Sequence, residues 1–458
     1  MKTAILALGI FLGSISAYAQ KASLFKPLRY DEDWSKIKRD SSTGSYDKIK
    51  FIPLTKHQKL PYLSLGGEVR YQYFYLKNED WGDATPDKDG FLLTRFLGHA
   101  DWHLNKHLRA FVQLQSSMAN SRLQPSVVEE NPLDLHQAFV EAKWNTSSQT
   151  TLTTRIGRQE LSYGSQRLVA VREAPNNRMA FDALKLIYQQ KNFKSDAFYS
   201  HPVANKAGIF DDHFSENAKF WGLYSVINHA PVLNNIDVYY LGIWKKTATL
   251  VAGKGEELRH SVGTRIWKTS GAWQYDFEGV YQFGTFQDKT IRAWTVSSNT
   301  TFQKDEWRLK PKFGLKTEAI SGDEDPNDNR VETFNPLYPK GAYFGLAALI
   351  GPSNLFDIHP SIDLELTDRL NWGMDYDIFW RLSKHDGIYA PNMSVIYAGK
   401  NTEEKFIGTQ LATDFNYQLN PFVYLRLEAT WFASGPFIQA ESAGKDIFMT
   451  ALTTQVKF

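Results

Sequence analysis

The sequence predicts an all-β protein: a single antiparallel β-barrel of about 18 strands that crosses a membrane. Three observations lead to this fold class. An export signal opens the chain, and no later apolar run reaches the roughly 18 residues of a transmembrane helix. Period-two alternation of apolar and polar residues recurs from Leu63 to Phe458. The connections are long and short by turns, as in barrels with short periplasmic turns and long extracellular loops.

The composition fits a wall with one face in lipid and the other in water. The 458 residues include 30 Phe, 22 Tyr and 13 Trp, yet the mean hydropathy is −0.41. The formal net charge of +2 gives no indication of a nucleic-acid partner. The chain has no Cys, which excludes disulfide frameworks, Cys-zinc sites and thiol nucleophiles.

The first 20 residues have the pattern of a secretory signal. Lys2 supplies the positive start, Ile5–Leu12 the apolar core, and Ala17-Tyr18-Ala19 the cleavage site. We therefore divide the chain into a signal peptide (1–19), a polar periplasmic segment (20–62) that plugs or wraps under the barrel, and the barrel itself (63–458). This predicts the outer membrane of a Gram-negative bacterium, with its lipid as a partner.

Individual strands follow from alternation. The first strand, Leu63–Lys77, places Tyr71 and Tyr73 on one face and Arg70 and Gln72 on the other. The alternative, a soluble β-sandwich, normally has strands of about five or six residues, whereas many here reach ten or more. Later strands are predicted near 92–104, 108–115, 138–144, 151–161, 182–190, 193–201, 218–228, 236–245, 257–267, 272–284, 290–302, 306–319, 354–366, 370–383, 406–417, 422–433 and 446–458.

Several segments carry a resemblance to a known family. The final strand ends on Phe458 and resembles the assembly signal of bacterial outer-membrane proteins. The alginate export family is resembled by Leu28–Trp34, Leu65–Arg70, Arg155–Leu168, Phe181-Asp182 and Ser321–Pro339. The most specific part is the run Gly-Arg-Gln-Glu-Leu, followed by Tyr-Gly and Arg-Leu. The resemblance implies an eighteen-stranded barrel whose lumen is made electropositive by Arg and Lys and passes an anionic uronate polymer.

Basic residues on the inward faces are the candidate conduit. A uronate polymer needs fixed positive charge to replace lost hydration, and the Arg fork meets a carboxylate bidentately. The loop Ser162–Phe181 is long, basic and on the outer side, from where it can fold into the throat. The candidate residues are Arg70, Arg95, Arg109, Arg155, Arg158, Arg167, Arg172, Arg178, Arg265, Arg308, Lys310, Lys312, Lys316, Arg381 and Arg426.

The same inward faces also carry acids, which leaves a second interpretation open. Glu68, Asp101, Glu141, Glu160 and Asp276 are among them. Arg–carboxylate bridges would then stiffen a mutually neutralised polar lumen. For the loop arginines we favour a functional role, since a loop is not needed to stiffen a wall.

Metal and enzyme chemistry are weakly indicated. Asp323, Asp325 and Asp328 cluster in one loop and could offer oxygen ligands to Ca²⁺, but a solvated acidic loop is the simpler interpretation, so no cofactor is expected. Nucleophile-elbow, Walker and H-E-x-x-H motifs are absent, so we expect no enzyme. The leading hypothesis is passive passage of an anionic polysaccharide or oligouronate, with export or uptake partners in the periplasm. The alternatives are a small-solute porin with mild anion preference and an outer-membrane barrel enzyme.

Overall fold

The computed structural model describes residues 24–37, 44–55, 60–147 and 149–458. The predicted signal peptide lies outside the described residues. Within them, no helix is both long and apolar enough to cross a membrane.

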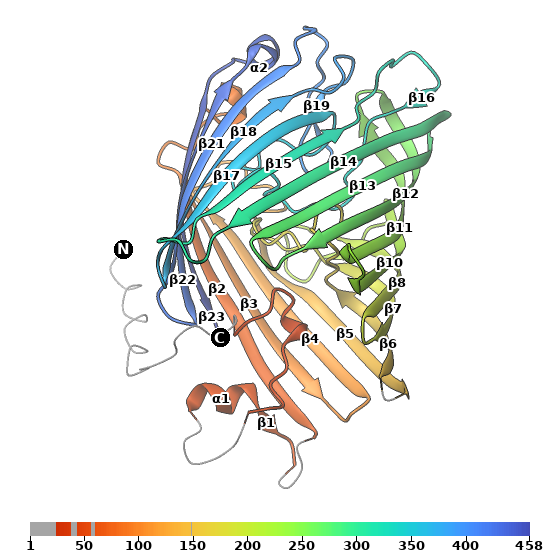
Figure 1. Cartoon of the computed structure of the whole chain (residues 1–458), viewed down its shortest axis with the longest axis vertical. Coiled ribbons are helices and arrows are strands. Elements are labelled where there is room, and N and C mark those ends of the chain that lie inside the picture. The colour runs from red at the N-terminus through yellow and green to blue at the C-terminus, as the bar shows by residue number, and fades with distance from the viewer. Residues whose placement is uncertain (1–23, 38–43, 56–59, 148) are drawn as a thin grey trace.

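The molecule is a closed antiparallel barrel of 18 strands, as predicted. Strand β2 pairs with both β3 and β23, which closes the sheet on itself (Figure 1). The wall strands are β2 (Tyr62–Lys77), β3 (Phe91–His103), β4 (Leu108–Asn120), β5 (Asn131–Ser147), β6 (Thr150–Gln159), β7 (Phe181–Gln190), β8 (Phe193–Ala204), β10 (Ala218–Ala230), β11 (Asn234–Leu250), β12 (Gly253–Lys268), β13 (Trp273–Phe286), β14 (Lys289–Gln303), β15 (Lys312–Ile320), β17 (Leu355–Thr367), β18 (Leu370–Trp380), β21 (Phe406–Gln418), β22 (Val423–Ser434) and β23 (Ile447–Lys457).

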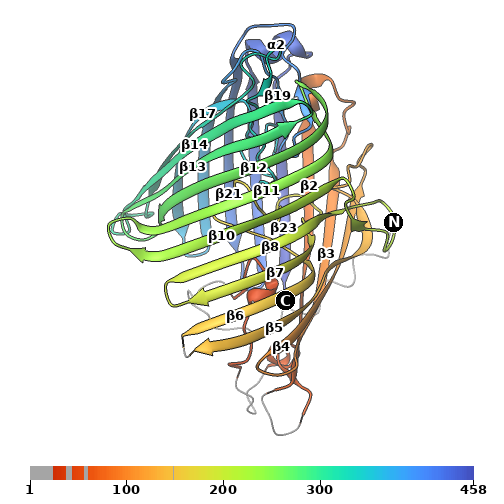
Figure 2. The same ribbon diagram turned by 90° about the vertical axis from the view of Figure 1, so that its right-hand side faces the viewer.

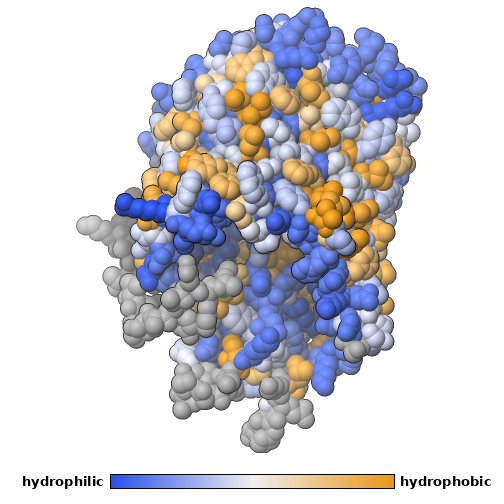
Figure 3. All heavy atoms as spheres, in the orientation of Figure 1, coloured by the Kyte–Doolittle hydropathy of each residue, from blue (hydrophilic) through white to orange (hydrophobic). Residues whose placement is uncertain are grey.

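The alternation in each strand separates a wet inner face from an apolar outer face. In β2, Glu68, Arg70 and Gln72 are buried toward the lumen, whereas Tyr71 and Tyr73 are exposed on the outside. Side chains of a strand point alternately to opposite faces, so the period read from the sequence becomes the lipid-facing surface. Figure 3 shows apolar residues around the middle of the barrel and polar residues over the end that carries α2 (Pro436–Glu441).

The chain terminus completes the seam of the barrel. Phe458 exchanges backbone hydrogen bonds with Gly67, at 2.8 and 3.0 Å, one step beyond the β2–β23 ladder. The carbonyl oxygen of Phe458 also accepts bonds from Arg29 Nη2 (3.0 Å) and Lys50 Nζ (3.1 Å). The N-terminal segment is therefore fastened to the seam. It contains the short helices η1 (Arg29–Asp31) and α1 (Ser45–Lys50) and strand β1 (Ile52–Pro53).

The two ends of the barrel differ (Figures 1 and 2). Short turns and the N-terminal segment lie at one end, and most long loops lie at the other, with η2 (Glu79–Gly82), β9 (His213–Phe214), β16 (Arg330–Val331), β19 (Ile388–Tyr389) and β20 (Val395–Tyr397). The strict alternation of loop length fails at two places: β11–β12 and β13–β14 are joined by tight turns on the long-loop side.

One predicted strand boundary is wrong in a way that bears on the site. The strand expected from Glu306 begins only at Lys312, and residues 304–311 form a turn. Leu309 and Lys310 have φ values of 67° and 40°, which no strand accommodates. Pro311 also lacks the N–H that a ladder requires. Arg308 and Lys310 therefore do not share a strand face with Lys312 and Lys316.

Candidate functional site

The throat of the barrel is formed by the connection between β6 and β7, residues 160–180, which folds inward. One part of it contacts β13, β14 and β15 through Arg167. Another part contacts β3 and β4 through Asn176, whose side-chain amide donates to the carbonyls of Thr94 and Met118. These strand groups are far apart around the closed sheet, so the loop crosses the lumen.

A second inward loop braces the first. Residues 321–354 connect β15 to β17 and run beside the 160–180 loop. Ala170 N donates to Tyr338 O (2.9 Å), Tyr338 N to Leu168 O (2.9 Å) and Lys340 N to Gln166 O (3.0 Å). Tyr338 packs edge-to-face on Phe181 and Phe220. Paired backbone and buried rings make this a fixed constriction rather than a loose cover.

Glu173 is the centre of the charged part of the throat. Its Oε1 lies 2.6 Å from Arg95 Nη2, and its Oε2 is paired with Arg178. Arg70 donates to the backbone oxygens of Glu173 (2.9 Å) and Pro175 (3.0 Å). The Glu173 side chain nevertheless remains 46% exposed. A carboxylate is thus presented to the lumen inside a cradle of guanidinium groups.

The electrostatics of this cradle favour a bound carboxylate. Burial alone would raise the pKa of Glu173, but Arg178, Arg95 and Arg70 together lower it below its usual range. The side-chain charges nearby balance, because Arg95 also pairs with Glu68 (2.6 Å) and Arg178 with Glu160 (2.6 Å). Such charge-assisted bonds are short and geometrically selective.

Arg167 anchors the opposite end of the loop. Its guanidinium lies 3.2 Å from both Glu278 and Glu318 and donates to Tyr343 Oη at 2.7 Å. Lys316 pairs with Glu318 (3.3 Å). With both neighbouring carboxylates engaged, Arg167 holds the loop in place.

Most predicted wall residues are paired with acids, mainly on neighbouring strands, although Lys316–Glu318 and Arg426–Glu428 lie within one strand and Lys310 lies in a turn. The pairs are Arg95–Glu68, Arg109–Asp101, Arg155–Glu141, Arg265–Asp237 and Asp276, Lys310–Glu365, Lys316–Glu318, and Arg426–Asp414 and Glu428. Among the described residues, no ion pair within 4.0 Å involves Arg70, Arg172 or Lys312. Arg70 nevertheless lies in the charge-balanced cradle around Glu173, whereas Arg172 and Lys312 lie outside it.

Some predicted conduit residues lie elsewhere. Arg158 pairs in register with Ala138 and Asp182, on the face that carries the exposed Ile156 and Leu184, so it points outward and binds Asp182 at 2.9 Å. Arg381 follows β18 and donates to backbone carbonyls of the 381–405 loop, including Glu404 O and Asp386 O. Arg308 is exposed in the 304–311 turn. These positions do not line the throat.

The N-terminal segment fills the other end of the lumen. Tyr30 is buried edge-on against Phe111 and Phe139, two inward residues of β4 and β5. Arg155 lies over its ring, 4.1 Å from the centroid. The Tyr30 hydroxyl donates to Glu160 O (2.9 Å), at the start of the throat loop. The segment thus contacts both the wall and the throat.

The candidate calcium ligands are not brought together. In the described part of the chain, Asp323, Asp325 and Asp328 form no group with ligand atoms within 4.8 Å of one another. Asp323 is buried beside Asp386, whose Oδ2 accepts its backbone N–H at 3.0 Å. Burial and the Asp386 carboxylate raise the pKa of Asp323 to about 7.

Sequence reasoning placed Asp375 and Asp377 of β18 among the inward acids, but it did not single out Glu173 or Tyr30. The signal for Glu173 was present, since it is the one acid between Arg167 and Arg178 in a basic loop. A single acid among several basic residues in one loop indicates that it pairs with them. The partners of Tyr30 belong to strands far away in sequence, and no local pattern identifies them.

Comparison with known proteins agrees with this architecture. The family model described as alginate export matches residues 61–449. No curated protein matches.

Solved structures with the same fold come from Pseudomonas aeruginosa. OccK3 (OpdO) is 11% identical, with a TM-score of 0.56 over 86% of this chain and 95% of that one. OpdK, solved with vanillate, is 11% identical, with a TM-score of 0.57 over 86% and 98%. OccK2 (OpdF), solved in complex with glucuronate, is 9% identical, with a TM-score of 0.55 over 86% and 98%. At this identity the likeness concerns the fold.

Proposed function

The chain belongs to the alginate export family, and from that premise we propose that this outer-membrane channel passes an anionic polysaccharide or its oligomers, an alginate-like polyuronate, through its Arg- and Lys-bearing lumen. The family and the porin-like barrel point to a channel rather than an enzyme.

One observation carries the proposal. The Glu173 carboxylate stands in the lumen between Arg95 and Arg178, with Arg70 bound to its backbone. This is the geometry that a uronate carboxylate would need at the same place, because a guanidinium fork matches two carboxylate oxygens. A passing sugar acid can exchange with Glu173, so that the arginines are never left unpaired.

The unpaired cations extend this contact beyond one point. Arg172 lies on the same loop as Glu173 and donates to Pro339 O at 3.3 Å, and it forms no ion pair within 4.0 Å with another described residue. Lys312 lies on the inward face of β15 and, among the described residues, takes part in no ion pair within 4.0 Å. Successive weak contacts suit conduction, because a substrate must enter a site and also leave it.

The uronate class is also supported by a neighbour. OccK2 (OpdF), a barrel of like fold, was solved in complex with glucuronate. Glucuronate is a single uronate, which leaves the length of the cargo to experiment.

The alternative is a general small-solute porin with mild anion preference. It is favoured by the extensive pairing of wall arginines with acids, which leaves little net charge along β2–β6. A polyuronate channel should bind solutes according to both their chain length and their charge, whereas a general porin should discriminate little by either.

Planar-bilayer recording separates them. We expect oligouronates to block the current of the purified full chain at lower concentration than neutral oligosaccharides of the same length. Arg172→Gln should weaken that block, whereas Arg308→Gln, in the exposed turn, should leave it unchanged. Equal block of the current by neutral and anionic oligomers would show that the protein is a general small-solute porin.

A further inference from the structure

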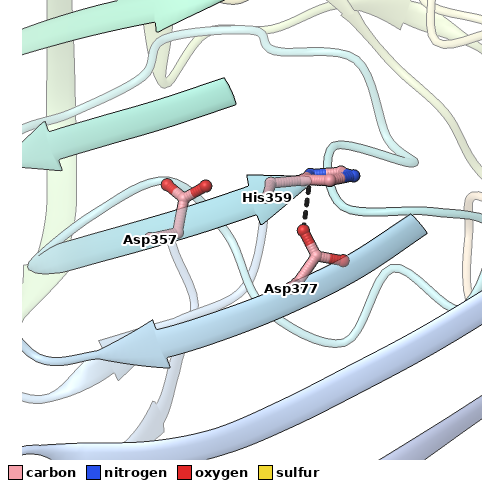
Figure 4. A group of neighbouring side chains, drawn as sticks. All are labelled: Asp357, His359 and Asp377. Atoms are coloured by element: carbon pink, nitrogen blue, oxygen red, sulfur yellow. Dashed lines mark ion pairs between the residues drawn. The ribbon is translucent and has the colours of Figure 1, made fainter. Parts of the chain in front are cut away.

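A cluster of two carboxylates and one imidazole lies on β17 and β18 (Figure 4). Asp357 is the register partner of Glu318 on β15, which pairs with Arg167 of the throat loop. Asp357 and His359 are two residues apart on β17 and so share its inward face. Asp377 comes from the neighbouring β18. One ligand atom from each of the three lies within 4.8 Å of the others, and His359 Nδ1 is 2.5 Å from Asp377 Oδ1.

Four polar atoms of this cluster lack a hydrogen-bond partner among the described residues. Asp357 is 0% exposed, yet neither of its carboxylate oxygens has a hydrogen-bond partner. His359 Nδ1 and Asp377 Oδ1 approach each other without hydrogen-bond geometry and are also unpartnered. A buried ionised oxygen without a partner is strongly unfavourable. A bound cation would satisfy these oxygens while Asp357 stays ionised.

Neighbouring cations are already engaged. Lys316, the cross-strand neighbour of His359, pairs with Glu318 and lies against the rings of Tyr343 (4.5 Å) and Phe344 (4.6 Å). Arg426 binds Asp414 and Glu428 at 2.7 and 2.6 Å. The carboxylates of Asp357, Asp375 and Asp377 are left with His359 as their one ion-pair partner among the described residues.

The surrounding contacts hold the side chains of Asp377 and His359 in place. Gln410 Nε2 donates to Asp377 Oδ2 at 3.0 Å, which leaves Oδ1 for another partner. His359 Nε2 lies 3.4 Å from Asp375 Oδ1, so the second ring nitrogen faces a carboxylate while Nδ1 faces the cluster. A carboxylate behind a histidine is the usual outer contact of a metal-binding imidazole.

From these contacts we propose that Asp357, His359 and Asp377 form a binding site for one divalent first-row transition-metal ion, such as Zn²⁺. A mixed set of one imidazole nitrogen and two carboxylate oxygens suits such ions, whereas Ca²⁺ and Mg²⁺ take all-oxygen sets. With His359 neutral, the charge of the ion balances the two ligand carboxylates. Three protein ligands leave a further position for water.

Binding requires a small adjustment. Two ligands at about 2.1 Å from one ion and at right angles are roughly 3 Å apart, so His359 Nδ1 and Asp377 Oδ1 must separate slightly. His359 is the more solvent-accessible of the two, with 16% of its side chain exposed against 0% for Asp377. Rotation of the imidazole therefore opens the site from the solvent side.

Titration of the untagged, detergent-refolded full chain tests the site. Co²⁺ is the probe, because its visible absorption reports nitrogen and oxygen coordination, and Zn²⁺ is added as competitor. We expect about one ion per chain, displaced by Zn²⁺ but not by Ca²⁺. Asp357→Asn and His359→Gln should each weaken binding at least about tenfold, with heat-modifiability retained as evidence of folding.

Two control variants make the result specific. Asp363→Asn removes a carboxylate farther along β17, and Asp211→Asn disrupts the group of Asp134, Asp211 and Asp212 at the long-loop end. Both should bind Co²⁺ as the unaltered chain does. No Co²⁺ bound by the unaltered chain, or equal binding after Asp357→Asn and His359→Gln, would overturn the proposal, and Asp357 would then be held as a neutral acid. Loss of binding only in Asp211→Asn would also overturn it.

Discussion

Replacing Glu173 by Gln should make the throat more anion-selective and strengthen its hold on uronates. In the structure, Glu68, Glu160 and Glu173 balance Arg70, Arg95 and Arg178. Gln keeps the shape of the side chain and can still accept a bond from Arg95, but it removes one negative charge. A cluster with no net charge thereby becomes a cluster with one positive charge exposed to the lumen.

The size of the effect follows from Coulomb's law. A unit charge about 4 Å away contributes roughly 1 kcal/mol in bulk water and roughly 4 kcal/mol at an effective dielectric constant of about 20. The Glu173 side chain is 46% exposed, so the lower part of that range applies. Since about 1.4 kcal/mol corresponds to a factor of ten in affinity, we expect oligouronate block to strengthen roughly five- to tenfold.

Reversal potentials and current block in planar bilayers measure this directly. In a salt gradient, Glu173→Gln should shift the reversal potential toward anions, and the shift should shrink at high salt because the charge is then screened. Glu403→Gln is the matched control, since Glu403 is exposed in an outer loop with Lys384 as its partner. An unchanged reversal potential together with unchanged block by oligouronates would refute the assignment of Glu173 to the throat.

Four further outcomes are expected. Tyr30→Ala removes a ring packed on Phe111 and Phe139; a loss of about 3 kcal/mol should loosen the N-terminal segment and raise single-channel conductance, and unaltered conductance would count against it. The pKa of Asp323 is raised to about 7, above its ordinary value near 4, so its neutral form stabilises the loops and that stability is lost as pH rises from about 4 to about 7. Protease resistance of the long-loop end should therefore fall over this window, and Asp323→Asn should flatten the change; a variant that keeps the full pH dependence would contradict this. Lys312→Gln should shift the reversal potential toward cations. Lys310→Gln should not, because Lys310 lies in a turn and its charge is paired with Glu365. Equal shifts in the two variants would mean that salt-bridge pairing does not determine which lysines set selectivity. Deleting Phe458 removes the backbone pair with Gly67 and the acceptor of Arg29 and Lys50, so less heat-modifiable protein should reach the outer membrane, which immunoblots of membrane fractions would detect.

The fold could be predicted because its main signal is local. Alternation between lipid and water repeats in every strand, so each strand can be identified without knowledge of its neighbours. The start of β15 was wrong for a related reason. Trp307, Leu309, Phe313 and Leu315 continue the alternation through a turn near the membrane edge, where aromatic and apolar residues are also favoured. Pro311 was the better boundary signal.

The candidate site was harder to predict than the fold, because the pairing of inward charged residues depends on the register between strands. Alternation places Arg109 and Asp101 on inward faces, but only the β3–β4 register brings them to 2.7 Å. A shift of one residue would reverse every face. The outward position of Arg158 could have been predicted, since Arg158 is two residues from the outward Ile156 and three from the inward Arg155. The position of Glu173 could not be predicted, because it depends on the fold of a loop that has no periodic sequence pattern.

Charge is distributed unevenly around the lumen, because ion pairs balance the charges on some strands and not on others. The wall of β2–β6 is balanced by cross-strand ion pairs. On β17, β18, β21 and β22 the inward carboxylates outnumber the cations, of which Arg426 and His359 are the ones that pair with them. The throat loop adds Arg172, which donates to the Pro339 carbonyl and forms no ion pair within 4.0 Å with any described residue. We therefore expect an anion in the lumen to be drawn toward the loop and repelled from β17–β22. A metal ion at Asp357 would weaken that repulsion and widen the path open to an anionic chain, so occupancy of the proposed metal site and selectivity of the throat should be coupled.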